Sequence, residues 1–592
     1  MKTNEKTKNN FFERFNKYKI ILCVLLVVYT IVSFVRLGNI KSPKTFANLL
    51  TDESVVYEIE DGAIPTSVVF FGGYDNSFFS IFLAQEYVSS HQSFEYDSSV
   101  DTDFMAVYSW EKKEFNLDKK ACKYVMLSSY ADSTVLGEVA FLDENNNIIK
   151  TRLIEGTDLL NDEQDLIQVK KNYLNSTYFD EIYYSRAAYE MFNNKYIFEF
   201  THPPLGKIIM WIPMALFGIS PFSFRLMGNI SGILMIFVMY ELAKELFKEE
   251  KYALFAAFII ALDGMHFAQT RIATVDTFLV LFGMISILFF IKYLNSKNDS
   301  EKKKYIYLGL SGIAWGCAVA TKWNSCYIGL GLGILFFVNY IRNEKIVINK
   351  KFNYKPILMG ALCFVVIPIL VYVASYIPVF CNSSACAPYD VFDAEGNKTA
   401  ELAYPNSIKG FIMYQYAMYQ YHSSIGKAED YTPHPFSSSW YTWPVIYKPM
   451  WFTVDTYENG LKSTIVSMGN PIIWWLSIAT LVIMCFYLII EDDGKKEGWT
   501  ILILILSTWL PYALISREMY IYHYFLTSIL MMLTIVFAVS KMIQRKPKYK
   551  FVIPVLIIVF LISFIYFYPV YSGMSVSEEY IDSTKWVSSW VY

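Results

Sequence analysis

The sequence predicts a polytopic α-helical membrane protein with one β-rich insert outside the membrane. Three observations lead to this fold class. The 592-residue chain is 54% hydrophobic and 18% aromatic, with a mean hydropathy of +0.30, which is too apolar for one soluble core and too long for one domain. Apolar runs of membrane-spanning length recur along most of the chain. A long segment after the first run has the short, alternating pattern of β-strands instead.

About eleven apolar runs approach the length needed to cross roughly 30 Å of hydrocarbon. The first run follows a basic N-terminus, which raises the alternative of a cleaved signal peptide. No small-residue cleavage site follows it, so we interpret it as an uncleaved span. The predicted spans are residues 20–36, 226–243, 252–267, 273–293, 305–321, 325–341, 356–376, 470–490, 499–515, 523–540 and 551–569.

Loop charge predicts the orientation of these spans. Most of the short-loop Lys and Arg residues fall in alternate loops, on the same side as the N-terminus, and the positive-inside rule makes that side cytoplasmic. The C-terminus and the large loops are then extracytoplasmic. The predicted organisation is a tail and first helix (1–37), an extracytoplasmic insert (38–175), a membrane module with interfacial helices (176–376), a large outer loop (377–469) and a C-terminal group of helices with an outer tail (470–592).

The insert at residues 38–175 contains short β-rich runs separated by Asp, Asn, Gly and Ser, which predicts an antiparallel β-sandwich. It is similar to galactose-binding-like sandwiches, although no sugar-binding residue can be carried over. We favour a structural spacer over a ligand-binding domain.

Several function classes have no support in the sequence. The net charge is -3, which does not favour nucleic acid as a partner. No Walker A, G-x-G-x-x-G, H-E-x-x-H or C-x-x-C motif is present, so a nucleotide or a tightly held zinc ion has no evident binding motif. Cys381 and Cys386 could close a small disulfide loop, an alternative that the sequence leaves open.

Candidate site residues begin directly after the insert. Asp180 and Glu181 open a Tyr-rich helix suited to the membrane surface. The alternative is that the two acids only stabilise the N-terminus of this helix by their charge. His202 and Lys207 stand at the head of a second, short apolar helix. A lysine there can snorkel to the interface or bind a lipid phosphate.

Further charges lie at predicted membrane depth. Asp263, His266, Arg271 and Asp276 fall within fourteen residues of otherwise apolar sequence. Each such group costs of order 3 kcal/mol to insert, so we favour a polar functional cavity over structural ion pairing. Lys322 with Trp323, and Arg517 with Tyr522 and His523, are interface-depth cations beside aromatic residues, which belt anchoring also explains.

Five motifs in order then carry a family resemblance. They are the Asp-Glu pair, THPPLGK, LDGMHFAQTRIATVDTF, TKWN and YHSSIGKAEDYTPHPFSSSWYTWP. Together they resemble the protein O-mannosyltransferase family of GT-C glycosyltransferases, over residues 1–36 and 176–592. The outer loop at 377–469 is too short for the MIR domain of eukaryotic members, and the insert is absent from them, so the chain resembles the bacterial branch.

The resemblance implies a GT-C fold and an inverting transfer of mannose from a polyprenyl-phosphate carrier to Ser or Thr of exported proteins. Asp180 is the implied base and Glu181 its supporting carboxylate. No metal is implied, although Asp263 could help hold a divalent cation, as in oligosaccharyltransferase relatives. The remaining implied roles are donor phosphate binding by Arg271, Lys207, Lys322, Arg517 and His523, support by His202, Asp263, His266 and Asp276, and an acceptor groove of His422, His434, Trp440 and Trp443.

Three alternatives remain. The same chemistry could act on an envelope lipid or a cell-wall polymer. A transporter or flippase would also have many spans and buried charges, but the charges gather on one side and no inverted repeat is visible. A receptor would leave Asp263, Arg271 and Asp276 without a purpose.

Overall fold

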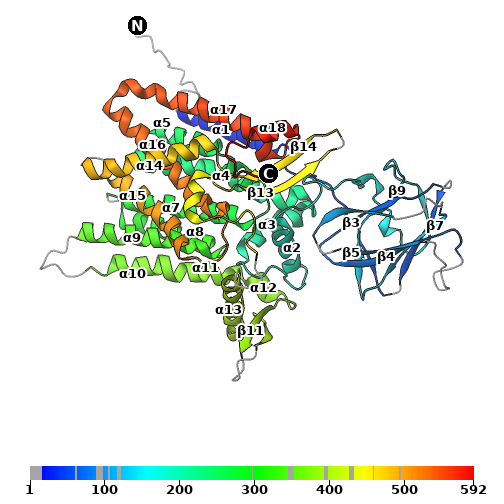
Figure 1. Ribbon diagram of the computed structural model, residues 1–592. Helices are drawn as coiled ribbons and strands as arrows, with labels where there is room; N and C mark the ends of the chain where they lie inside the picture. Colours follow the sequence, from blue (N-terminus) through cyan, green and yellow to red (C-terminus); the bar gives the residue numbers. More distant parts are fainter. Residues whose placement is uncertain are drawn as a thin grey trace, which may run out of the picture.

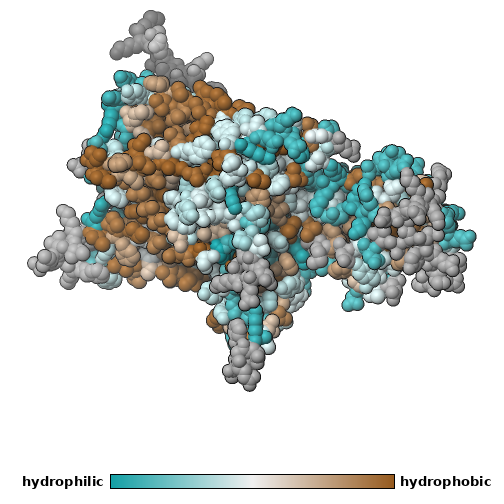
Figure 2. Space-filling model, viewed as in Figure 1, coloured by the Kyte–Doolittle hydropathy of each residue, from teal (hydrophilic) through white to brown (hydrophobic). Residues whose placement is uncertain are grey.

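A computed structural model describes residues 17–592 except 52, 61–62, 88–97, 105–106, 116–121, 297, 345–352, 393–397, 426–431, 458 and 492–494. The described chain forms a bundle of apolar helices with a β-sandwich at one end (Figure 1). Hydrophobic residues dominate the surface of the bundle, whereas the sandwich surface is largely polar (Figure 2). The fold class predicted from the sequence is therefore confirmed.

Nine helical segments in the described residues are long and apolar enough to cross a membrane. Eight are centred on single long helices. The ninth, Lys355–Cys381, joins three short helices through a π-helical turn at Leu362–Val366. The helices of these segments are α1 (Lys17–Phe34), α4 (Pro221–Phe247), α7 (Val275–Asn295), α9 (Cys326–Glu344), α10 (Lys355–Ala361) with α11 (Ile367–Ser375) and α12 (Ile377–Cys381), α14 (Pro471–Ile490), α15 (Lys495–Trp509), α16 (Phe525–Arg545) and α17 (Val552–Ser572).

Two predicted spans take a different form. The run at 252–267 is divided into α5 (Glu250–Ala261) and α6 (Gly264–Gln269), because Asp263 ends one helix and caps the next by accepting from the His266 amide. Twelve residues of α5 rise only about 18 Å. The run at 305–321 belongs to α8 (Glu301–Val319), whose first turn contains three lysines. Both helices contact long helices of the bundle, and with the nine full-length segments of the described chain they account for the eleven predicted runs.

The sandwich is built from antiparallel sheets. Its larger sheet has the order β10-β2-β7-β4-β5, a second sheet has the order β6-β3-β9, and β1 pairs with β8. Apolar side chains from both main sheets, such as Val55, Phe70 and Ile81, fill the space between them. The strands are β1 (Ala47–Leu49), β2 (Ser54–Ile59), β3 (Ser67–Gly72), β4 (Ser77–Ala84), β5 (Ser98–Phe104), β6 (Ser109–Glu114), β7 (Tyr124–Ser129), β8 (Thr134–Leu136), β9 (Val139–Leu142) and β10 (Thr151–Glu155).

The sandwich shares a hydrophobic core with the membrane module. Phe71, Tyr74 and Tyr108 of the sandwich join one buried cluster with Tyr184 of α2 (Glu181–Phe192) and Met210 of α3 (Leu205–Phe217). The Tyr108 hydroxyl donates to the Ile219 carbonyl at 2.7 Å. The sandwich is therefore packed firmly on the helices that follow it in the chain.

The segment between α12 and α14 folds outside the bundle. It contains the hairpin β11 (Ala387–Phe392) with β12 (Lys398–Ala403), the helix α13 (Ile408–Ser424), and the hairpin β13 (Met450–Thr456) with β14 (Lys462–Ser467). A short helix, α18 (Glu578–Ser583), lies near the C-terminus. Cys381 and Cys386 are free thiols, so the structure does not contain the disulfide that the sequence left open.

Candidate active site

A cavity of about 780 Å³ lies between α2, the segment at 196–202, α13, β11 and the segment at 517–523. A second cavity of about 430 Å³ adjoins it. Six of the described residues line both cavities and so form a shared wall. They are Thr201, His202, Lys322, His422, Arg517 and His523. Four were predicted as phosphate-binding or supporting residues and one as part of an acceptor groove, although they come from four separate parts of the sequence.

Asp180 lines the larger cavity at the start of α2. Its side chain does not cap the helix, and no described residue forms a hydrogen bond or ion pair with its carboxylate. Burial raises the pKa of Asp180 to about 7, and Asp276 and Glu199 reinforce this shift while Lys322 opposes it. A carboxylate with an elevated pKa and unused acceptor oxygens is suited to taking a proton.

Glu181, the neighbouring acid, has a different environment. It is fully buried and forms a two-pronged ion pair with Arg225 of α4, with both N–O distances at 2.7 Å. It also accepts from the Ala273 amide at 3.0 Å. Glu181 therefore ties α2 to α4 and to the start of α7, and so fixes the helix that carries Asp180. Arg225 was not singled out from the sequence.

Lys322 forms a buried ion pair with Asp276, at 2.9 and 3.0 Å to the two carboxylate oxygens. The ammonium also lies 5.7 Å from the centre of the Tyr522 ring. The sequence placed both charged residues in one site, and the structure brings them together across the start of α7. Asp276 holds Lys322 at the shared wall.

Arg517 is oriented by a histidine. Its Nη1 donates to His422 Nδ1 at 3.0 Å, and His422 Nε2 in turn donates to the Thr201 carbonyl at 2.8 Å. Burial lowers the pKa of His422 to about 3, with His202 and Arg517 adding to the shift, so the ring is neutral and Nδ1 is free to accept. No carboxylate among the described residues pairs with Arg517, which leaves most of its guanidinium donors for a ligand.

His523 stands beside Arg517 in the same wall. Its Nδ1 accepts from the Tyr520 amide at 3.2 Å and lies 3.0 Å from the Tyr520 carbonyl oxygen, and its ring stacks on Trp443 with 6.2 Å between ring centres. Trp443 is buried and does not line either cavity, so it supports His523 from behind. The predicted acceptor-groove role does not fit Trp443.

Lys207 and Glu199 form a second buried ion pair, at 2.5 Å. Lys207 also donates to the backbone carbonyls of Glu199 and His202. His202 donates to the same carboxylate at 2.8 Å, and Lys207 and His202 together outweigh burial and hold the pKa of Glu199 well below its usual range. Lys207 thus shapes the segment at 199–202 and lies outside the cavity linings, unlike its predicted role. Glu199, an acid in an otherwise apolar run before THPP, was not among the site residues predicted from the sequence.

Arg271 also lies away from the cavities. Its guanidinium donates to the carbonyls of Ser33, Val35 and Arg36 at 2.9 to 3.0 Å, and it lies over the Phe267 ring. The last carbonyls of a helix have no partner within that helix, and Arg271 satisfies them at the end of α1. These contacts support an anchoring role, in place of the predicted phosphate contact.

Asp263 and His266 are fully buried structural residues. Asp263 accepts from the His266 amide, the Asn470 amide and the Trp474 ring nitrogen, at 2.9 to 3.0 Å. His266 bonds to the Tyr29 hydroxyl at 3.1 Å and to the Gly232 carbonyl at 3.0 Å. Three N–H donors on one carboxylate describe a helix junction and offer no support for a cation there.

Two further predicted groove residues lie outside both linings. His434 is exposed, and Trp440 packs on Trp509 with ring centres 5.6 Å apart. The larger cavity is lined instead by an aromatic group from α2, the segment at 196–200, β11, the end of α13 and the segment at 520–522. Its members are Tyr183, Tyr184, Tyr196, Phe198, Phe200, Tyr389, Tyr421, Tyr520 and Tyr522.

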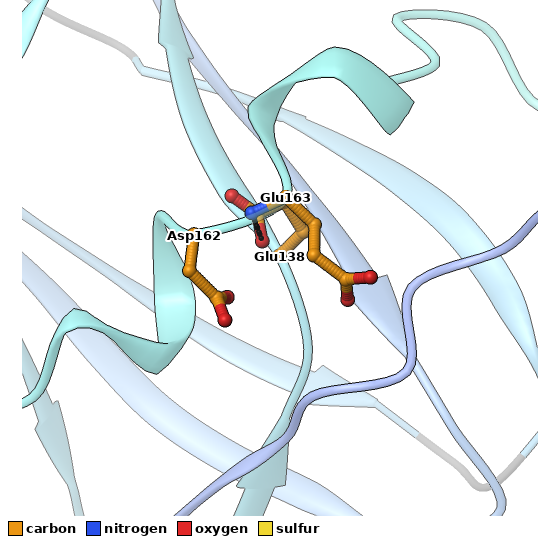
Figure 3. Close-up of side chains that lie close together, drawn as sticks. All are labelled: Glu138, Asp162 and Glu163. Atoms are coloured by element: carbon orange, nitrogen blue, oxygen red, sulfur yellow. Dashed lines mark hydrogen bonds between the residues drawn. The ribbon is translucent and has the colours of Figure 1, made fainter.

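Among the described residues, one group of acidic side chains lies close enough to share a cation. Its members are Glu138, Asp162 and Glu163 of the sandwich, with carboxylate oxygens within 4.8 Å of one another (Figure 3). Glu138 accepts from the Glu163 amide and the Gln164 side chain, and Glu163 accepts from the amides at 44 and 45. These hydrogen bonds account for the group as a junction that holds the start of the sandwich.

The fold, and a cavity that brings the Asp180 carboxyl together with the cations Lys322 and Arg517, fit a polytopic glycosyltransferase of the GT-C type. Residues 167–381 match the family described as dolichyl-phosphate-mannose-protein mannosyltransferase, and residues 407–590 match the C-terminal four-helix region of protein O-mannosyltransferase. The chain belongs to the protein O-mannosyltransferase family. Both matches begin after the sandwich.

Relatives and a solved structure agree with this assignment. A polyprenol-phosphate-mannose–protein mannosyltransferase of Mycolicibacterium smegmatis is 23% identical over 70% of this chain and 87% of its own length. The enzyme of that name from Mycobacterium tuberculosis is 22% identical over 70% and 86%. The S. cerevisiae Pmt1–Pmt2 complex bound to the sugar donor shares the fold with a TM-score of 0.60 at 14% identity, over 71% of this chain and 90% of that one.

Proposed function

We propose that the enzyme transfers a mannosyl residue from a polyprenyl-phosphate carrier to Ser or Thr hydroxyls of exported proteins, with inversion, at the outer face of the membrane. The observation that carries this proposal is the placement of Asp180 in the same cavity as Lys322 and Arg517, the two cations of the shared wall. The donor and acceptor named for the mycobacterial relatives support it.

The shared wall is suited to a lipid phosphate as leaving group. Arg517 and Lys322 supply positive charge, and His523 supplies a ring at the same place. When the glycosidic C–O bond breaks, its electron pair goes to the phosphate oxygen, and these cations stabilise the growing negative charge. Asp276 and His422 hold the two cations in position.

Asp180 is suited to the acceptor side. As the acceptor oxygen bonds to the anomeric carbon, its proton passes to the Asp180 carboxylate. An inverting displacement needs the nucleophile and the leaving group on opposite faces of that carbon. The aromatic group that lines the larger cavity would cover the sugar and the acceptor chain and exclude water.

The proposed orientation rests on loop charge, which places the N-terminus in the cytoplasm and the C-terminus with the active site outside. No divalent cation is part of the proposed reaction. The sandwich would then lie outside as well, packed on α2 and α3.

The test is transfer of radiolabelled mannose from polyprenyl-phosphate mannose to a Ser/Thr-rich peptide by purified enzyme in liposomes. Asp180→Asn is run beside the wild type, with both shown to be folded. Label on the peptide with wild type alone is the expected result. Label on a lipid or polymer fraction, with none on peptide or exported protein, would replace the proposed acceptor and leave the donor chemistry in place.

A further inference from the structure

One face of α13 exposes a continuous apolar and aromatic stripe. Ile408 is 84% exposed, Ile412 59%, Tyr416 43% and Tyr419, which also lines the edge of the second cavity, 60%. These positions follow the spacing of one helical face, and the only other exposed side chain within that face is Lys409. Four large side chains in one stripe are more than the scattered apolar residues of an ordinary water-facing surface.

The opposite face of α13 packs on the outer end of the Lys355–Cys381 span. Tyr414, Ala417 and Met418 are buried there. The Phe411 ring lies 5.1 Å from the Tyr376 ring, and Tyr372 and Tyr376 both donate to the Gln415 side chain. Because these contacts fix the rotation of α13 about its own axis, the stripe cannot turn inward.

The end of that span beside α13 also exposes apolar side chains. Ile369, Leu370, Val373 and Ile377 of α11 and α12 are 39 to 62% exposed in a segment of membrane-spanning hydropathy. Figure 1 shows α13 below the end of the α10–α11 rod and directed away from the bundle. The exposed apolar side chains of α13 therefore lie next to those of a candidate membrane span.

We propose that α13 is an interfacial helix whose stripe of Ile408, Ile412, Tyr416 and Tyr419 lies in the headgroup region of the bilayer. Such helices bury one apolar face about 5–10 Å into the boundary between headgroups and acyl chains. Tyr416 and Tyr419 suit that depth, since a tyrosine ring is apolar and its hydroxyl is polar. Lys409, at the edge of the stripe, can reach the lipid phosphates.

This seating has a consequence for the shared wall, a link that rests on the proposed function. The last turn of α13 carries His422, which orients Arg517. The bilayer thus holds the helix that positions a phosphate-binding cation, and enzyme removed from a bilayer holds that cation less firmly.

The depth of α13 is tested by spin labelling, which does not depend on activity. In a chain with the exposed Cys23, Cys326 and Cys381 changed to Ser, a nitroxide is attached at Ile412→Cys or at Ala400→Cys, an exposed position on β12. In liposomes, the ratio of oxygen to nickel-complex accessibility is expected to be several-fold higher at 412 than at 400. Equal ratios would mean that the stripe faces water, and low accessibility to both reagents at 412 would mean a protein partner. Either result overturns the proposal.

The link to Arg517 is tested separately by transfer assays. Ile412→Asp is expected to reduce transfer several-fold in liposomes and to have little effect in detergent, whereas Ala400→Asp is neutral in both. A correct depth at 412 with no effect of Ile412→Asp would keep the interfacial helix and remove its link to the active site. If the wild-type enzyme transfers no mannose in this assay, the proposed function is contradicted. The accessibility measured at position 412 is not affected by that outcome.

Discussion

Arg517 Nη1 lies 3.0 Å from His422 Nδ1, and the imidazole is fixed in turn by a 2.8 Å hydrogen bond to the Thr201 carbonyl. This arrangement requires a neutral histidine that accepts on one side and donates on the other. Thr201 belongs to the segment before α3, so one imidazole joins three separate parts of the cavity wall.

Removal of this imidazole should therefore act on turnover. His422→Ala is expected to lower kcat roughly 10- to 100-fold, the rate equivalent of one hydrogen bond to a charged group, because Arg517 loses its orientation. His434→Ala is the matched control, since that histidine is exposed in the same loop and outside both cavities. Equal effects of the two variants in the mannose transfer assay would contradict the positioning role.

Substitutions of the adjacent acids Asp180 and Glu181 should have different effects, the first on turnover and the second on stability. Asp180→Asn is expected to abolish transfer while the midpoint of thermal unfolding in detergent stays near the wild-type value. Glu181→Gln is expected to lower the free energy of unfolding by about 3–5 kcal/mol, because the buried Arg225 guanidinium then has no carboxylate partner and only one acceptor oxygen. An Asp180→Asn enzyme that is folded and active would eliminate Asp180 as the base.

Turnover should depend on pH through Asp180. Its pKa is raised to about 7, and only the deprotonated form can accept the hydroxyl proton, so kcat should rise as pH rises through 7 and level off above it. The test is a pH profile of single-turnover transfer between about pH 5.5 and 8.5, a range that brackets the expected pKa of about 7. A profile that is flat across this range would mean that a different group controls the reaction.

Arg271→Ala should lower the stability of the fold and have little effect on donor binding. The guanidinium satisfies three carbonyls at the end of α1, so its loss is expected to lower the unfolding midpoint, with KM for the donor within about twofold of wild type in the folded fraction. Arg517→Ala is the comparison, for which KM and kcat should both change. A large rise in donor KM for Arg271→Ala alone would restore the phosphate contact predicted from the sequence.

Removal of divalent cations should leave transfer unchanged. Asp263 already accepts three N–H donors, and the acidic group in the sandwich does not line the cavities. Activity after EDTA treatment and dialysis is therefore expected to match the untreated enzyme. Loss of activity that Mn²⁺ or Mg²⁺ restores would show that a cation takes part.

The sequence predicted the membrane fold, the β-rich insert and much of the site, because spans and strands leave periodic apolar patterns. It also selected Asp180, Lys322, Arg517 and His523, which the fold brings to one cavity. It could not sort buried charges by partner. Lys207 and Arg271 have the same signature as ligand-binding cations, and only tertiary packing reveals that Glu199 and the end of α1 engage them.

The division of the predicted span at residues 252–267 into two helices could not be predicted from the sequence either. Residues 252–267 have a spanning hydropathy, but Asp263 interrupts them with a cap whose partners lie about 200 residues away, at Asn470 and Trp474. Local periodicity carries no information about such partners. The same limit explains why Trp440 and Trp443 were assigned to a groove although they pack against neighbouring aromatic rings.

The common core of the sandwich and the membrane module sets an order for assembly in the cell. Tyr74 and Tyr108 are made long before Met210 and Phe224, against which their cluster closes. During synthesis, part of this face of the sandwich stays uncovered until α3 and α4 have been made and can pack against it. A chaperone at the membrane surface, or rapid insertion of the next helices, would protect that face, and truncation after the sandwich would leave it permanently bare.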